Sequence, residues 1–140
     1  FSIRWILGRR MNEKELISTA SDAAEELIDA ESYPFVEGWR AWRVRGKWFM
    51  LATTMPANKP FGGKKAIILK APPEDVSALQ AGYADIGPAY HMNKRHWYTV
   101  YPGDSINPKL VRELVQESYA AVVQKLPKAQ RPAGWQEAVR

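Results

Sequence analysis

The sequence predicts an α+β fold: a two-layer sandwich, with an antiparallel five-stranded sheet and helices on one face. Two long segments, one near each end of the chain, repeat their apolar residues with the period of a helix. Five shorter segments between them are apolar throughout or alternate between apolar and polar residues, as strands do. Short turns between strands require antiparallel neighbours, and two amphipathic helices require one apolar sheet face to cover. The expected order is helix, three strands, short helix, two strands, helix.

The first helix is expected over residues 13–29 and ends before Tyr33-Pro34. Asn12, with Glu15 three residues later, forms a capping signal at its start. One face of the segment is apolar, and the other face carries charged residues. The apolar positions are Leu16, Ile17, Ala20, Ala23, Ala24, Leu27 and Ile28.

Residues 39–54 are expected to form a β-hairpin. In its first strand, the alternation of residue types places Trp42 and Val44 in the core. The same alternation turns Arg43 and Arg45 to solvent.

The turn of this hairpin is expected at Gly46-Lys47. Residues 48–52 are apolar on both faces, which is typical of a central strand. Residues 55–63 contain two prolines and two glycines, which predicts an exposed loop. The third strand is expected over residues 64–70.

A short helix begins at the prolines of residues 72–73, and Gly82 is expected to cap its end. Residues 83–90 lead into the fourth strand, and residues 97–101 form the fifth. The six residues 91–96 form a polar, basic connection between these two strands.

The last helix begins after Asn107, a capping residue that precedes a proline at the first helical position. Pro127 ends it. The tail from Lys128 onward is basic and contains proline and glycine. The buried stripe of the helix is expected to comprise Leu110, Val111, Leu114, Val115, Ser118, Tyr119, Val122, Val123 and Leu126.

Composition places the chain among soluble single domains. Its 140 residues are enough for one domain with a substantial core, and 46% are hydrophobic and 25% charged. The chain has no cysteine, which excludes disulfides and thiolate chemistry and fits a reducing compartment, so we expect a cytoplasmic protein. No apolar run approaches the roughly 20 residues that cross a bilayer, so no membrane partner is expected.

The net charge of +5 depends on the first ten residues. We interpret residues 1–10 as added or upstream sequence, because Met11 opens a plausible native start. They contribute three of the 20 basic residues; without them, 17 basic and 15 acidic residues leave a net charge of +2. Residues 11–127 are then one domain and residues 128–140 a basic C-terminal tail.

Residues 88–101 contain both histidines of the chain, together with lysine, arginine, tryptophan and three tyrosines. This segment resembles the His-x-Asn-Lys-x-His-Trp motif of the MmcQ/YjbR family of small bacterial proteins. The motif positions here are His91, Asn93, Lys94, His96 and Trp97. Supporting matches are Arg45-Gly46-Lys47-Trp48-Phe49, Leu69-Lys70 and Ser118-Tyr119, and the resemblance covers about residues 12–127.

The resemblance implies a CyaY-like or secretion-chaperone-like α+β sandwich, in agreement with the element order above. Members of the family are commonly described as candidate DNA-binding proteins with a double-wing motif. The resemblance therefore implies a DNA-binding protein, and it names no catalytic residue and no cofactor.

Three roles are open for the histidine segment. His91 and His96, with Asn93, are residue types that bind metals or transfer protons. No aspartate or glutamate lies between Asp85 and Asp104 to complete a ligand set, so we expect no metal and no catalytic role. The interpretation we favour is that these side chains hold a tight turn by hydrogen bonds. The third role is contact with a ligand or phosphate.

Basic residues at the expected hairpin tips form a candidate nucleic-acid surface, because cationic side chains bind phosphates. The candidate residues are Arg43, Arg45, Lys47, Lys64, Lys65, Lys94 and Arg95. The alternative is a solvated face whose charges discourage edge aggregation.

Two functions of different classes remain in view. The first is a non-enzymatic protein that binds double-stranded DNA weakly and without sequence specificity, through backbone contacts of the basic tips. The second is a protein-interaction or chaperone-like module that holds a protein partner on the exposed sheet face. An enzyme built on His91 and His96 is a third hypothesis, and we expect no enzyme and no cofactor.

Overall fold

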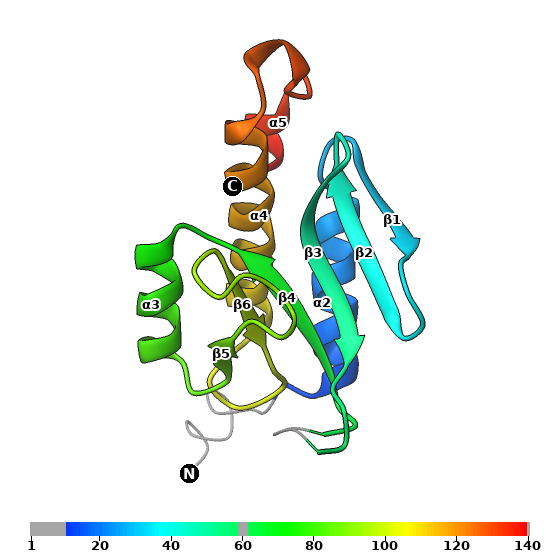
Figure 1. Cartoon of the computed structure of the whole chain (residues 1–140). Coiled ribbons are helices and arrows are strands. Elements are labelled where there is room, and N and C mark those ends of the chain that lie inside the picture. Colours follow the sequence, from blue (N-terminus) through cyan, green and yellow to red (C-terminus); the bar gives the residue numbers. More distant parts are fainter. Residues whose placement is uncertain (1–10, 59–61, 140) are drawn as a thin grey trace.

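The computed structural model describes residues 11–58 and 62–139. The segment 1–10, interpreted above as added or upstream sequence, lies outside the described residues. The elements, shown in Figure 1, are α2 (Glu13–Glu25), β1 (Ala30–Pro34), β2 (Trp39–Val44), β3 (Lys47–Thr54), β4 (Lys65–Lys70), α3 (Pro73–Gly82), β5 (Ile86–Pro88), β6 (Trp97–Val100), α4 (Pro108–Lys125), the 3₁₀ helix η1 (Lys128–Gln130) and α5 (Trp135–Ala138).

The fold is α+β with an antiparallel sheet, as predicted, but the sheet has six strands rather than five. Their order is β1-β2-β3-β4-β6-β5. The additional strand is β1, which pairs with β2 along the edge of the sheet. The first helix correspondingly ends at Glu25 and not at residue 29. Pro34, taken as the signal that ends the helix, instead lies in an edge strand, where its missing N–H costs little.

Helices α2 and α4 pack against each other and against one face of the sheet, whereas α3 lies beside β5 and β6. In Figure 1, α2 and α4 lie behind the sheet, and the segment between β5 and β6 crosses in front of it. We call the side away from α2 and α4 the open face. The main core lies on the helix side and includes the predicted residues Leu16, Leu27, Leu114, Val122, Phe49 and Ile67.

Leu51 is buried as predicted, but on the open face and not beneath the helices. The reason is a β-bulge in β3. Trp42 pairs with Met50 and Arg43 with Trp48, so Phe49 has no partner of its own. Phe49 and Met50 therefore both contribute to the helix-side core, and Trp48 turns to the open face with Leu51.

The turn between β2 and β3 is also displaced from its predicted position. Val44 pairs with Lys47, so the two turn residues are Arg45 and Gly46, with φ of 51° and 78°. Two residues with positive φ form the turn that matches the twist of a hairpin. Lys47 is therefore the first residue of β3 rather than a turn residue.

The remaining differences concern ends of elements. The short helix is capped by Tyr83 and not by Gly82. The basic tail contains η1 and α5, and Trp135 of α5 packs into the helix-side core. Among the described residues, no helix combines the length and apolar character needed to span a bilayer.

Candidate nucleic-acid interface

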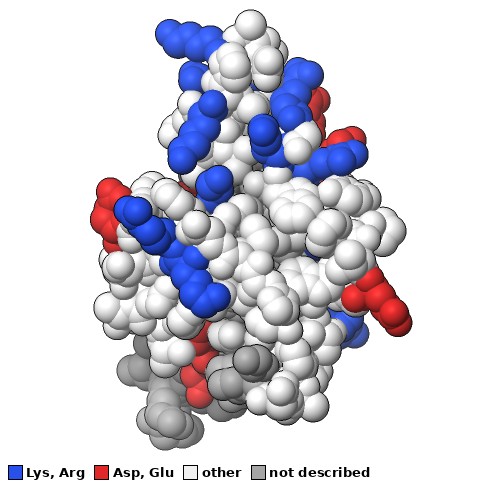
Figure 2. Space-filling view, in the orientation of Figure 1, with Lys and Arg blue, Asp and Glu red and all other residues white. Residues whose placement is uncertain are grey.

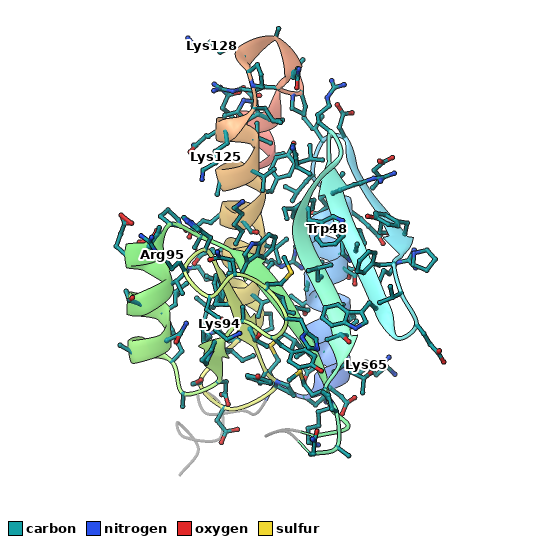
Figure 3. All side chains as sticks on the ribbon, viewed as in Figure 1. Trp48, Lys65, Lys94, Arg95, Lys125 and Lys128 are labelled. Carbon is teal, nitrogen blue, oxygen red and sulfur yellow. The ribbon has the colours of Figure 1, made fainter. Side chains whose placement is uncertain are left out.

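The predicted cationic tips lie at opposite ends of the sheet. Lys47 begins β3, whereas Lys65 pairs with Thr54 at the other end of the same strand. Seven residue steps of roughly 3.3 Å separate these positions by roughly 23 Å. Figure 3 shows Lys65 at the lower end of the sheet, and Figure 1 places the turn between β2 and β3 at the upper end. The tips therefore do not form a single rim.

Lys65 also lies on the other side of the sheet from the open face. In β4, the alternate residues Ile67 and Leu69 belong to the helix-side core, and Lys65 shares their parity. Lys65 lines a groove together with Ile17 of α2. Lys64 is exposed in the loop before the strand.

Arg43 and Arg45 are both engaged in ion pairs along the edge of the sheet. Arg43 Nε donates to Glu31 Oε1 at 2.7 Å, and this hydrogen bond raises the pKa of Arg43. Its guanidinium carbon also lies 4.4 Å from the ring centroid of Tyr33. Arg45 Nη2 lies 3.2 Å from Asp29 Oδ2. These partners reduce the net positive charge that either arginine presents.

The family-motif segment forms a turn held by its own side chains. Asn93 Oδ1 accepts hydrogen bonds from the backbone amides of Arg95 at 2.9 Å and His96 at 3.3 Å. Lys94 Nζ donates to the carbonyl oxygen of Ala89 at 2.9 Å. Trp97 N donates to the Asn93 carbonyl oxygen at 3.0 Å. The predicted turn-holding role is therefore observed for the Asn93 side chain. Lys94, which was predicted to contact phosphate, also donates a hydrogen bond within the turn.

The two histidines have different surroundings. His91 has a φ of 62°, and its ring centroid lies 4.0 Å from that of Tyr90. His96 accepts a hydrogen bond from Ala71 N through its backbone carbonyl oxygen, so it joins the turn to the end of β4. In the part of the chain that the structure describes, no three His, Asp or Glu residues gather as a metal site would require.

The open face carries a group of aromatic side chains that sequence reasoning did not assemble. We call Tyr33, Trp39, Trp48 and Tyr90 the aromatic face. The indole N–H of Trp48 donates to the Tyr33 hydroxyl at 2.7 Å. The rings of Trp39 and Tyr90 stack at 5.9 Å with an interplanar angle of 10°. All four rings are half-buried and rest on the apolar cluster that includes Leu51 and Ile68.

Cations border this aromatic face on two sides. Figure 2 shows an uncharged surface over β2 and β3, with Lys and Arg side chains above it and to its left. Figure 3 places Lys94 and Arg95 to the left and Lys125 toward the upper end, with Trp48 between them and β2. The open face is therefore bordered by four of the residues that were predicted to contact nucleic acid, namely Arg43, Lys47, Lys94 and Arg95. Lys65 lies on the other side of the sheet.

Two further lysines reach the upper end of this face, and sequence reasoning missed both. Lys70 pairs across the sheet with Trp97, and its Nζ lies 5.4 Å from the Trp97 ring centroid. Lys125 lies in the last turn of α4. A signal existed for Lys70, since the position before the short helix shares a strand face with Ile68. No sequence signal existed for Lys125, because only the packing of α4 against the sheet brings it to the upper end of the open face.

Fold and site together define a class: a small α+β sandwich with two helices on one sheet face and a basic, aromatic opposite face. The YjbR family model matches residues 19–121, and the chain belongs to that family. The motif turn lies inside the matched region, as do all six strands of the sheet.

Relatives and solved structures agree with this membership. The chain is 38% identical over 119 residues to the uncharacterized protein YbdF of Escherichia coli O157:H7, covering 84% of this chain and 93% of YbdF. It is 31% identical over 93 residues to the uncharacterized protein YjbR of Escherichia coli K12, covering 66% of this chain and 75% of YjbR.

Among solved structures, the fold is similar to Deinococcus radiodurans protein DR2400, with a TM-score of 0.67 and 26% identity, covering 91% of this chain and 88% of that one. The fold is also similar to that of a Pseudomonas syringae protein, with a TM-score of 0.61 and 31% identity, covering 79% of this chain and 98% of that one.

Proposed function

We propose that this protein is a non-enzymatic nucleic-acid-binding protein that holds a single strand against the open face of its sheet. The observation that carries the proposal is the aromatic face bordered by cations. The family resemblance implied a DNA-binding protein, and the proposal keeps that class while changing the contact surface and the form of the strand.

A nucleotide has two parts that this surface could contact, the base and the phosphate. Unpaired bases stack on aromatic side chains, which Tyr33, Trp39, Trp48 and Tyr90 supply. Phosphates require cations at the margin of such a platform, and Arg95 and Lys94 are placed there. A duplex hides its bases and would need the basic tips to converge. Because Lys47 and Lys65 lie at opposite ends of β3, a single strand fits the surface better.

The surroundings of the histidines favour a non-enzymatic role. Within the described residues, no hydrogen bond joins either imidazole to a carboxylate that would orient it for proton transfer. The hydrogen bonds of Asn93 and Lys94 stay inside the turn. These hydrogen bonds give Asn93 and Lys94 a structural role within the turn.

The test is a salt-dependent titration of residues 11–140 with a fluorescent oligothymidylate and with a duplex of equal length. Non-specific binding of this kind has a dissociation constant of about 10⁻⁴–10⁻⁶ M at physiological salt. The single strand should bind more tightly, and Arg95→Ala should weaken it and reduce the salt slope by about one unit. The matched control is Lys65→Ala, which removes a cation on the other side of the sheet. This variant should bind the single strand as tightly as the wild type does.

A second candidate function is supported by a separate observation. Phe35 and Val36, in the loop between β1 and β2, are 44% and 52% exposed. They line a groove of about 640 Å³ that also includes Ile17 of α2. Exposed apolar residues beside a groove are typical of protein contacts, so a protein partner docking here is the alternative. Pull-down of a partner by the wild type, and its loss in a Val36→Ser variant, would favour this alternative, because Val36 is exposed beside the groove.

A further inference from the structure

A pocket of about 470 Å³ opens at the upper end of the open face, where the turn between β2 and β3 approaches the last turns of α4. Its lining includes three lysines and two tryptophans: Lys47, Trp48, Lys70, Trp97 and Lys125. These side chains come from four elements, namely β3, β4, β6 and α4. The volume lies in the range of small-ligand sites.

The pocket has an excess of positive charge. Within the part of the chain that the structure describes, none of the three ammonium groups forms an ion pair with a carboxylate. Burial lowers the pKa of Lys70, and the positive charges of Lys125 and Lys47 lower it further. Three like charges around one cavity repel one another, and an anion placed between them would relieve that repulsion.

The walls of the pocket are flat and apolar. Trp97 is only 7% exposed, and the Lys70 ammonium lies 5.4 Å from its ring centroid. Trp48 is half-buried, and its indole N–H is already bonded to the Tyr33 hydroxyl, which fixes the edge of the ring that faces β1. Val122 and Leu126 of the α4 region complete the lining. Because Trp97 is nearly buried beneath the Lys70 ammonium, Trp48 is the flat wall that can accept a planar ring next to the charged group.

Buried contacts hold the lysine of β4 in place. Ser118 Oγ accepts a hydrogen bond from Lys70 N at 2.8 Å and donates to the carbonyl oxygen of Phe49, the bulged residue of β3. The same bulge turns Trp48 toward the pocket side of the sheet. The positions of Lys70 and Trp48 are therefore set by the fold before any ligand binds, which lowers the cost of binding.

We propose that this pocket binds a phosphate monoester whose organic part carries a planar ring, with the phosphate among Lys47, Lys70 and Lys125 and the ring against Trp48. A nucleoside 5′-monophosphate has this chemistry, whether it is free in solution or is the 5′-terminal nucleotide of a strand. The proposal goes beyond the function proposed above, because a ligand in this pocket does not require a strand across the aromatic face.

The test is isothermal titration of the full chain with adenosine 5′-monophosphate, with adenosine and inorganic phosphate as partial ligands. The monophosphate should bind more tightly than either part and quench tryptophan fluorescence. Lys70→Met and Lys125→Gln should each weaken it about tenfold, since each removes one charge-assisted contact. Lys65→Gln is the control and should leave the affinity unchanged. Unchanged affinity in the Lys70→Met, Lys125→Gln double variant, or no binding at millimolar monophosphate, would overturn the proposal.

Oligothymidylates with a 5′-phosphate and with a 5′-hydroxyl separate the two sources of the ligand. If a strand end occupies the pocket, the phosphorylated strand binds more tightly and adenosine monophosphate competes with it. If the ligand is a free nucleotide, the 5′-phosphate has no effect while the monophosphate still binds. A Trp39→Ala variant tests independence, because it should weaken binding of the unphosphorylated strand and leave the monophosphate affinity intact.

Discussion

The buried hydroxyl of Ser118 accepts a hydrogen bond from the backbone amide of Lys70 at 2.8 Å, and this contact ties α4 to the end of β4. The same hydroxyl donates to the carbonyl oxygen of Phe49, so one side chain satisfies polar groups of two adjacent strands. The next residue, Tyr119, donates from its hydroxyl to the Ile28 carbonyl oxygen at 2.7 Å. The Ser118-Tyr119 pair therefore joins α4 to the sheet and to the segment after α2.

Ser118→Ala should destabilise the protein by about 1–3 kcal/mol, because it leaves a buried amide and a buried carbonyl group without this partner. The measurement is the free energy of unfolding in urea. Ser18→Ala is the matched control: Ser18 is exposed on α2, and its loss should change the free energy by less than about 0.5 kcal/mol. Equal stability of the two variants would contradict the proposed role of Ser118.

Leu114→Ala should cost about 2–5 kcal/mol, the range for large-to-small changes in a core. Leu114 is 4% exposed within the helix-side core. Arg112→Ala, at an exposed position of the same helix, is the control and should be nearly neutral. If the Leu114→Ala variant were as stable as the wild type, α4 would not cover the sheet as described.

Asn93→Ala should destabilise the protein by about 0.5–2 kcal/mol, the range found when a side chain that caps backbone amides is removed. Asn93→Asp keeps an oxygen that can accept hydrogen bonds from Arg95 N and His96 N. This variant should therefore lose much less stability than Asn93→Ala. Urea unfolding of both variants checks this. If aspartate and alanine are equally harmful, the motif asparagine has some role other than accepting these two hydrogen bonds.

Lys70→Met should stabilise the protein at pH 7, and this gain should diminish in alkali. The pKa of Lys70 is lowered in the folded state, chiefly by burial, so keeping its charge costs folding free energy at pH 7. As the pH rises from the lowered folded pKa to the ordinary value of 10.5, the folded state releases its proton first and the cost disappears. Methionine keeps most of the apolar side-chain packing.

The measurement for Lys70 is the difference in unfolding free energy between variant and wild type at several pH values from 7 to 10.5. Lys109→Met, on an exposed position of α4, is the control for the general effect of removing a lysine. If Lys70→Met does not stabilise the protein at pH 7, or if the gain in stability grows with pH, the charge of Lys70 does not carry the folding cost described here.

Helices α2 and α4 were predictable because their apolar periodicity is long and regular, and the hairpin between β2 and β3 was predictable from its apolar strands and its glycine-containing turn. The edge strand β1 was not, because Ala30–Pro34 has no clear alternation and contains a proline. The bulge at Phe49 left no trace in the sequence, since residues 48–52 are apolar on either face. Its consequence, the position of Trp48 on the open face, could be obtained only from the pairing of β3 with β2.

The candidate site was predictable only in part. The turn held by Asn93 followed from local residue types, whose effects do not depend on distant packing. The basic tips at Lys47 and Lys65 do not converge on one surface, because they lie at the two ends of one strand. The pocket joins Lys70 to Lys125, and no sequence pattern relates residues brought together by the docking of a helix on a sheet.

The aromatic face is tested most directly by mapping backbone amide chemical shifts of residues 11–140 during titration with an oligothymidylate. The account predicts the largest changes at Trp39, Trp48, Tyr90 and Arg95, reduced at high salt, and none at Lys65 on the other side of the sheet. Changes concentrated around Val36 and α2, or the absence of any change at low salt, would contradict the claim that a single strand lies on the open face.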